Sequence, residues 1–281
     1  MRLGNNPLRN AKISPLAKIV VLVITHLPEM QSDYHKDRFE VVKHSLTTLT
    51  ENINMEPEEY DLVVWDNGSC QELRDWLDGF VCKRFYTCNI GKTNAQKMVM
   101  RMLPEGTILA YGDDDIEYFP NWLAPQIGIL ETFPNVGMVT GWPVRITGTW
   151  GMDATRKWMD DNLNIFDPRL LEIGRFIPDE WERDYCDSVG RNYEEYKTTT
   201  WGVNDYRITY KGMQAYAMSQ HAQFVCYPER VEPLRLWSDE AMEEEGSFDK
   251  AVDAAGLLRL STVDRYCRHI GNVLDCNGNV I

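Results

Sequence analysis

The sequence contains few of the features that mark membrane-spanning or nucleic-acid-binding proteins. No run of 18 or more apolar residues occurs, so a transmembrane segment is not expected. Basic residues are scarce, with 29 Lys and Arg against 43 Asp and Glu and a formal net charge of −14. A protein that binds nucleic acid through its phosphates needs a basic surface, so the sequence carries no strong nucleic-acid signal.

Cysteines are also few and widely spaced. The chain has seven, none in a CxxC pair, and this odd number favours reduced thiols in a cytoplasmic protein. Residues 1–17 are polar and lack the apolar core of a signal peptide, so we expect them to form an N-terminal extension. The remainder is expected to be globular, because 43% of the residues are hydrophobic and 11% are aromatic.

Apolar runs alternate with amphipathic stretches through the first half of the chain. Short runs rich in branched or aromatic residues predict buried strands at 18–25, 60–65, 81–88, 107–111 and 136–140. Helical spacing of apolar residues predicts helices between them at 37–53, about 73–80, 93–103 and from Pro120 onwards. This alternation predicts an α/β fold, with a parallel sheet that helices cover on both faces.

The second half is less regular. Residues 148–210 are rich in Trp, Tyr, Asp and Arg and are interrupted by Pro and Gly. We expect them to form loops and short helices over the ligand-binding edge of the sheet. Helical periodicity returns at Phe248 and Val252, where a helix is predicted to end at Gly256 before a short strand at 258–260.

Polar residues follow three of the predicted strands. They are Thr25-His26, Asp66-Asn67-Gly68 and Asp113–Asp115. Ligands of open α/β sheets bind beyond the carboxyl ends of the strands. The sequence therefore predicts that these three segments line one crevice.

The segment Asp113-Asp114-Asp115 is a candidate metal site. Adjacent, partly buried carboxylates raise one another's pKa values unless a cation lies among them. If the segment is extended, Asp113 and Asp115 point to the same side and can share Mg²⁺ or Mn²⁺. Such an ion takes few protein ligands and completes its shell with phosphates, which suits a nucleotide diphosphate. The alternative is a solvated acidic turn.

Two other segments are candidates for binding a nucleotide. Asp66-Asn67-Gly68-Ser69 is typical of a β-turn, and Asp66 is also placed to accept hydrogen bonds from a base or ribose. The loop 89–95 holds a single Gly, so it is neither a P-loop nor a dinucleotide-binding motif. It nevertheless leads into a helix N-terminus, where anions bind favourably.

Taken in order, these segments resemble those of inverting, metal-dependent GT-A glycosyltransferases of the family 2 type. The resemblance is carried by IVVLVIT, LVVWDNGS, NIGKTNAQ, ILAYGDDDIEYFPNW and VGMVTGWPVR, and weaker matches follow at 243–256 and 269–272. It implies a GT-A-like nucleotide-sugar-binding half at 18–145. An acceptor-binding half at 146–281 would belong to the same compact domain.

The resemblance also implies roles for individual residues. Asp113 and Asp115 would hold Mn²⁺ or Mg²⁺ on the donor diphosphate, and His269 would lie beside that metal. The donor nucleotide would be bound at the strand ends and the loop that follows them, by Thr25, His26, Asp66, Asn67, Gly91, Asn94 and Asp114. For His269 the alternative is a packed or capping histidine.

A carboxylate before the C-terminal helix serves as the catalytic base in that family. Where the family has Glu-Asp, this chain has Glu244-Glu245, which places Glu245 at the position of the base and Glu244 beside it. Asp239 is a second candidate. The alternative for the glutamates is an acidic helix start that complements the helix dipole.

The resemblance thus implies a hexosyltransferase that moves a sugar from a nucleotide diphosphate-sugar to the hydroxyl of an unidentified acceptor, with UDP-sugar favoured as the common donor of the family. Tryptophans in the second half suggest an aromatic acceptor groove, although core packing is the alternative for each of them: Trp142, Trp150, Trp158, Trp181, Trp201 and Trp237. Two other functions remain open. One is a sugar-nucleotide nucleotidyltransferase, although residues 27–33 lack the Gly-rich basic loop expected there. The other is a non-catalytic carbohydrate- or nucleotide-binding module.

Overall fold

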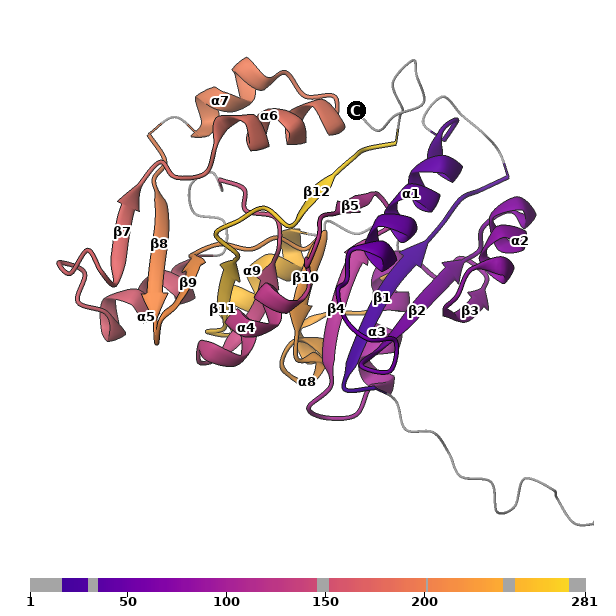
Figure 1. The fold of residues 1–281 in the computed structure, drawn as a ribbon, viewed down its shortest axis with the longest axis horizontal. Coiled ribbons are helices and arrows are strands. Elements are labelled where there is room, and N and C mark those ends of the chain that lie inside the picture. Colours follow the sequence, from indigo (N-terminus) through magenta and orange to yellow (C-terminus); the bar gives the residue numbers. More distant parts are fainter. Residues whose placement is uncertain (1–16, 30–34, 146–151, 201, 240–245, 273–281) are drawn as a thin grey trace, which may run out of the picture.

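The computed structural model describes residues 17–29, 35–145, 152–200, 202–239 and 246–272. Within these residues a mixed ten-stranded sheet forms the centre of the molecule, in the order β3-β2-β1-β4-β10-β6-β11-β9-β8-β7 (Figure 1). Its strands are β1 (Ile19–Thr25), β2 (Tyr60–Asn67), β3 (Lys83–Thr87), β4 (Ile108–Asp113), β6 (Val136–Thr140), β7 (Leu171–Gly174), β8 (Asp205–Tyr210), β9 (Met213–Tyr216), β10 (Gln223–Cys226) and β11 (Leu258–Ser261). A separate antiparallel pair is formed by β5 (Ile116–Tyr118) and β12 (Cys267–His269).

Helices connect and cover these strands. They are α1 (Arg38–Glu51), α2 (Gln71–Gly79), α3 (Lys92–Met102), α4 (Ala124–Thr132), α5 (Asp153–Asn162), α6 (Asp179–Ser188), α7 (Tyr193–Thr200), α8 (Pro228–Val231) and α9 (Gly246–Ala254), with a 3₁₀ turn at Glu232–Leu234. In the described part of the chain, no helix is both long and apolar enough to cross a lipid bilayer.

The core has two layers because strand side chains alternate between the two faces of the sheet. On β1, Val21 and Val23 pack into one hydrophobic cluster with residues of α1, α2 and α4. Val20 and Leu22 of the same strand pack into the other cluster, with residues of α3, α8 and α9. The predicted α/β class, with helices on both faces of the sheet, is therefore confirmed.

The predicted parallel arrangement holds for only part of the sheet. Strands β3, β2, β1 and β4 are parallel neighbours. However, β10 runs antiparallel between β4 and β6, so the predicted strands at 107–111 and 136–140 are not adjacent. The inserted strand has only four residues and comes from 223–226, where no strand was predicted. A parallel arrangement is therefore found for the strands β3, β2, β1 and β4, whereas the sheet as a whole is mixed.

The second half is more regular than its composition suggests. The segment predicted as loops and short helices also contains β7 and β8, which pair with each other and extend the sheet through β9. These strands are short and half-exposed, so they show no continuous apolar run. Helices α6 and α7 lie beyond the end of the sheet where β12 is found (Figure 1).

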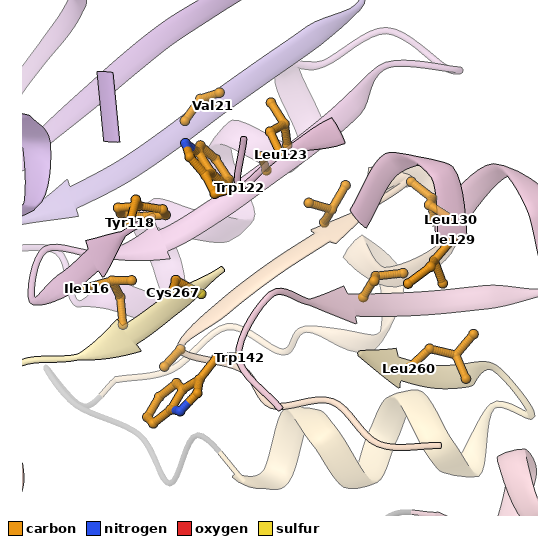
Figure 2. Packing of buried hydrophobic residues seen from close by; sticks show 14 of the residues in the cluster. Val21, Ile116, Tyr118, Trp122, Leu123, Ile129, Leu130, Trp142, Leu260 and Cys267 are labelled. Atoms are coloured by element: carbon orange, nitrogen blue, oxygen red, sulfur yellow. The ribbon is translucent and has the colours of Figure 1, made fainter. Parts of the chain in front are cut away.

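Residues 120–123 anchor the core rather than open a helix, and α4 begins only at Ala124. Asn121 has a positive φ of 63°, and its N–H donates to the carbonyl of Asn52 at the end of α1. The indole N–H of Trp122 donates to the carbonyl of Leu49. Figure 2 shows Trp122 beside Tyr118, and their ring centroids are 4.6 Å apart.

A buried arginine joins the end of the first half to the second. The guanidinium of Arg145 donates to both carboxylate oxygens of Asp205 at 3.0 and 3.1 Å and to Glu182 at 2.7 Å. All three side chains are at most 2% exposed. This network fixes α6 against β8, beside the ligand-binding edge of the sheet.

Candidate active site

The register of the parallel strands brings the predicted polar segments to one edge of the sheet. Thr25 of β1 pairs with Asp66 of β2, and Ile24 pairs with Asp113 of β4. These residues stand at or next to the carboxyl ends of their strands. The structure therefore brings together the strand ends that the sequence singled out.

Asp66 is buried inside its own turn. One carboxylate oxygen accepts the backbone N–H of Ser69 at 3.0 Å, and the other accepts Arg74 Nε at 2.7 Å. Gly68 has a φ of +86°, and a Cβ there would lie 2.7 Å from the backbone nitrogen of Asn89. The turn considered for this segment is thus present, and the contact of Asp66 with a base or ribose stays a prediction.

A small polar network borders this turn. His26 Nδ1 lies 3.0 Å from the carbonyl oxygen of Asn67, whose side-chain oxygen accepts the N–H of Ile90 at 2.9 Å. Asn89 connects to the side chains of Asn67 and His26 at 3.1 and 3.5 Å. The hydroxyl of Thr25 is buried and has no hydrogen-bond partner among the described residues. These amides and hydroxyls supply the donors and acceptors that a nucleoside needs.

The predicted donor-binding loop is connected to the chain segment before the candidate catalytic base. Gly91 has a φ of 84° and precedes the first residue of α3. The side-chain amide of Asn94 donates to the carbonyl of Ser238 at 2.7 Å, and its oxygen accepts the N–H of Ser238 at 3.0 Å. Asn94 therefore holds residue 238 against the start of α3.

The three aspartates lie at a turn, not in an extended segment. Strand β4 ends at Asp113, and residues 114 and 115 turn the chain into β5. The expected strand alternation, which would place Asp113 and Asp115 on one side, is therefore wrong at this point. The segment can turn here because β5 leaves the main sheet and pairs with β12.

Two basic residues neutralise the aspartates. Lys92 Nζ lies 2.7 Å from Asp113 Oδ1, which also accepts the hydroxyl of Tyr111 at 2.5 Å. The guanidinium of Arg38 forms ion pairs with Asp114 and with Asp115, the latter at 3.0 Å. Arg38 begins α1 and Lys92 begins α3. Two helix N-termini therefore face the Asp-rich turn.

The pKa values of two of these aspartates move in opposite directions. Burial raises the pKa of Asp114 to about 6; the charge of Arg38 opposes this shift, and the neighbouring aspartates add to it. Burial alone would also raise the pKa of Asp115, but His269 and Arg38 outweigh it and hold that pKa well below its usual range. The turn thus concentrates negative charge that a further cation would stabilise.

His269 lies beside the Asp-rich turn, as the resemblance implies. Its Nε2 is 3.4 Å from Asp115 Oδ2, and its Nδ1 is 2.8 Å from Ser188 Oγ. The hydroxyl of Ser188 also donates to the carbonyl of Tyr185 at 2.8 Å. The backbone N–H of Gly271 donates to Nδ1 at 3.2 Å, so Nδ1 is an acceptor and the ring proton lies on Nε2, facing Asp115. Burial lowers the pKa of His269, but Asp115 outweighs burial and raises that pKa. A metal ion bound at Nε2 would take the place of this proton.

These residues fit a divalent cation that keeps few protein ligands. Asp114 Oδ2 and Asp115 Oδ1 are buried and lack hydrogen-bond partners among the described residues. Two neighbouring ligands of an octahedral ion at about 2.1 Å lie about 3 Å apart, close to the spacing of Asp115 Oδ2 and His269 Nε2. The described residues contain no preformed cluster of three or more His, Cys, Asp or Glu ligands. Diphosphate oxygens and water would have to supply the remaining ligands, as is usual for Mg²⁺.

A cavity of about 570 Å³ opens next to these groups. Asp113 and His269 line it together with Trp142, Tyr185 and Tyr196. The rings form a continuous series: His269 stacks on Trp142, whose ring meets Tyr185 edge-on, and Tyr185 meets Tyr196 edge-on. An aromatic wall that starts at His269, beside the Asp-rich turn, suits a saccharide, because sugars present apolar C–H faces to aromatic rings.

Of the three candidate catalytic bases, only Asp239 lies in a described segment. Glu244 and Glu245 lie outside the described residues. Asp239 is described and exposed, one residue after the Ser238 that Asn94 holds. The position of the catalytic base therefore stays a prediction.

The tryptophans in the described part of the chain do not share one groove. Of the four that lie in described segments, only Trp142 lines the cavity. Trp158 packs between Phe133 and Tyr210, and Trp237 is 53% exposed at the surface. Core packing is therefore the better interpretation for Trp158 and Trp181, and Trp150 and Trp201 lie outside the described residues. The tyrosines of α6 and α7 that line the cavity were missed.

Sequence reasoning also missed other residues of the site. Arg38 and Lys92 carry no motif, and Ser188 occurs in a segment without periodicity. His221, Gln220 and Asp249 also line the cavity. Only Asp249 left a signal, because it is a carboxylate between Phe248 and Val252, which both face the core.

Comparison with known proteins gives the family. The sequence model described as Glycosyl transferase family 2 matches residues 35–211, more than half of the chain. A solved structure of GalNAc-T7 with UDP, GalNAc and Mn²⁺ is 13% identical, with a TM-score of 0.49 over 90% of this chain and 43% of that one. The mannosyltransferase PcManGT from Pyrobaculum calidifontis, in complex with GDP-Man and Mn²⁺, is 20% identical, with a TM-score of 0.34 over 45% of this chain and 35% of that one.

This chain thus spans less than half the length of either solved relative. No curated protein sequence matches it significantly. The family match and the mixed α/β sheet covered on both faces agree with the GT-A-type fold that the resemblance implies. On the strength of the family match, the chain belongs to glycosyl transferase family 2, and its glycosyltransferase domain includes residues 35–211.

Proposed function

We propose that this protein transfers a hexose-type sugar from a nucleotide diphosphate-sugar to a hydroxyl of its acceptor, with inversion at the anomeric carbon. The observation that carries the proposal is that Asp113 of the Asp-rich turn and His269, which lies beside that turn, both line a cavity of about 570 Å³. UDP-sugar is the first donor to test. The family match supports glycosyl transfer in general.

Asp113, Asp115 and His269 would hold Mn²⁺ or Mg²⁺. Bound there, the ion would act as a Lewis acid that offsets the charge developing on the leaving diphosphate. Arg38 and Lys92, which already pair with the aspartates, place two more positive charges at the same position. The burial of Asp115 limits competition from water for these charges.

The donor nucleotide would lie across the ends of β1 and β2 and the loop before α3. Candidate contacts are Thr25, His26, Asp66, Asn67, Gly91, Asn94 and Asp114. Glu245 would take the proton of the acceptor hydroxyl as that oxygen attacks the anomeric carbon, with Glu244 beside it and Asp239 as the alternative base. The aromatic wall of the cavity would receive the acceptor.

A donor-turnover assay tests this function. The protein is incubated with UDP-glucose, UDP-galactose, UDP-N-acetylglucosamine or GDP-mannose, with Mn²⁺ or with EDTA, and released nucleoside diphosphate is measured. We expect release from at least one donor that depends on the metal. Pyrophosphate formation from a nucleoside triphosphate and a sugar 1-phosphate would instead indicate a nucleotidyltransferase. Tight donor binding without release, even with a panel of saccharide acceptors, would indicate a binding module.

A further inference from the structure

The lining of the cavity contains several buried polar atoms without a hydrogen-bond partner in the described part of the chain. They are Trp142 Nε1, Ser219 Oγ, Gln220 Nε2 and Asp249 Oδ1. Trp142, Ser219 and Asp249 are at most 6% exposed. Buried polar groups in folded proteins are almost always hydrogen-bonded, so several exceptions in one cavity point to a ligand that satisfies them.

The chemistry of these atoms defines that ligand. The indole and amide nitrogens are donors, the carboxylate oxygen is an acceptor, and the serine hydroxyl can be either. A group that pairs with all of them must present donors and acceptors close together. Adjacent hydroxyls of a sugar ring do this, whereas a phosphate presents acceptors only.

A histidine in the same cavity lining is held by a carboxylate. Asp249 Oδ2 lies 2.9 Å from His221 Nδ1 and 3.0 Å from Arg259 Nη2. Asp249 comes from α9 and Arg259 from β11, so two elements that pack together hold the imidazole. When the neutral ring donates its Nδ1 proton to the carboxylate, Nε2 becomes an acceptor for a hydroxyl proton.

His221 lies close to the Asp-rich turn, which would hold the donor diphosphate. Its neighbour Ala222 accepts the backbone N–H of Asp113 through its carbonyl oxygen at 2.9 Å, so residues 219–221 lie directly beside the Asp-rich turn. In a nucleotide sugar, the sugar is bonded directly to the diphosphate that this turn would hold. Residues 219–221, which line the same cavity as Asp113, would therefore lie close to that sugar.

We propose that His221, oriented by Asp249, hydrogen-bonds a hydroxyl of the sugar being transferred and determines which sugar the enzyme accepts. Ser219 and Gln220 would contact neighbouring hydroxyls on the same ring. The inference rests on the proposed function and adds to it the residues that read the donor sugar. Asp249 is a positioning residue in this arrangement, because it acts through the imidazole.

The test compares intact donor with nucleotide alone. Calorimetry with Mn²⁺ measures the affinity for UDP and for UDP-glucose. If wild type turns over another donor of the four-member panel fastest, that donor and its own nucleoside diphosphate are used instead. His221→Ala should weaken donor binding by about tenfold or more, which is about the effect of one lost hydrogen bond, and leave nucleotide affinity within about twofold. Asp249→Asn should change the same ratio in the same direction by a smaller factor.

Deoxy donors identify the hydroxyl. Wild type should bind the one deoxy analogue that lacks the contacted hydroxyl about tenfold more weakly than it binds the intact donor. The His221→Ala variant should bind that analogue and the intact donor with the same affinity. His44→Ala is the matched control, since His44 pairs with Glu117 at 3.0 Å and does not line the cavity. If His221→Ala fails to fold, His221→Gln takes its place with the same expected loss of discrimination.

Three results would overturn the inference. Equal weakening of nucleotide and donor would place His221 in the nucleotide site, and a fall in turnover with donor affinity unchanged would make it a proton-transfer group. Unchanged affinities and sugar preference would leave it a structural residue. A wild-type protein that binds no nucleotide or donor with Mn²⁺ would instead contradict the proposed function itself.

Discussion

A methyl group added at Gly112 tests the packing behind the Asp-rich turn. Gly112 immediately precedes Asp113 on β4, and a Cβ built there would lie 1.8 Å from Tyr118 Oη and 3.2 Å from Tyr118 Cζ. Tyr118 cannot move aside easily, because it is 1% exposed and its ring lies 4.6 Å from that of Trp122. Gly112→Ala therefore forces either strand β4 or the Tyr118 ring to shift by about 1 Å or more.

The expected cost lies at the upper end of the usual range for overpacking, about 3 kcal/mol. For a domain of this size such a loss lowers the melting temperature by about 6–12 °C. Thermal and urea unfolding of the purified variant measure it. Gly79→Ala is the control, because a Cβ at the end of α2 meets nothing within 4 Å and should be neutral or slightly stabilising.

Removing the Tyr118 hydroxyl tests whether this group causes the destabilisation by Gly112→Ala. Tyr118→Phe alone should cost about 1 kcal/mol, and in combination with Gly112→Ala it leaves Cζ at 3.2 Å as the nearest atom, a contact that small shifts can absorb. The double variant should therefore be less destabilised than the sum of the two single variants, with a coupling energy of about 2 kcal/mol. Additive losses would refute the clash between Cβ and Oη as the reason that glycine stands before the aspartates.

Three further substitutions test other parts of the account. Arg145→Met should lower the free energy of unfolding by about 3–5 kcal/mol, because its buried carboxylates lose their cation, whereas Arg169→Met at an exposed pair should leave the urea midpoint nearly unchanged. Asp66→Asn should raise the donor KM by about tenfold and keep the metal dependence, and a shifted metal requirement at unchanged KM would contradict its placement at the nucleoside. Glu245→Gln should lower kcat by about 10²- to 10⁴-fold with donor affinity kept, and normal turnover in this variant together with its loss in Asp239→Asn would move the base to Asp239.

The sequence was most informative where a pattern is local. The branched apolar runs of β1, β2 and β4 identify buried strands, and the turn residues directly after them mark the edge where ligands bind. This is sufficient to place Thr25, Asp66 and Asp113 together, because the carboxyl ends of parallel strands must meet at one edge. The α/β class and the family follow from the same segments.

The remaining features depend on residues far apart in the chain. Arg38 and Asp114 are 76 positions apart, and only the packing of α1 against β5, the strand that follows the Asp-rich turn, makes them partners. The pair of His221 and Asp249 likewise forms only when β10 enters the sheet beside β4. β10 has only four residues, too few for a periodic signal, so neither the mixed sheet nor this wall of the cavity was predictable.

Metal-dependent nucleotide binding by the Asp-rich turn is the central claim, and one calorimetric comparison tests it most directly. UDP is titrated into wild type, Asp115→Asn and the exposed control Asp160→Asn, each with Mn²⁺ and with EDTA. The account predicts that wild type and the control bind UDP only with Mn²⁺, and that Asp115→Asn loses this binding while its melting temperature in the absence of metal stays close to that of the wild type. Binding of UDP to Asp115→Asn with unchanged affinity and unchanged dependence on Mn²⁺ would contradict it.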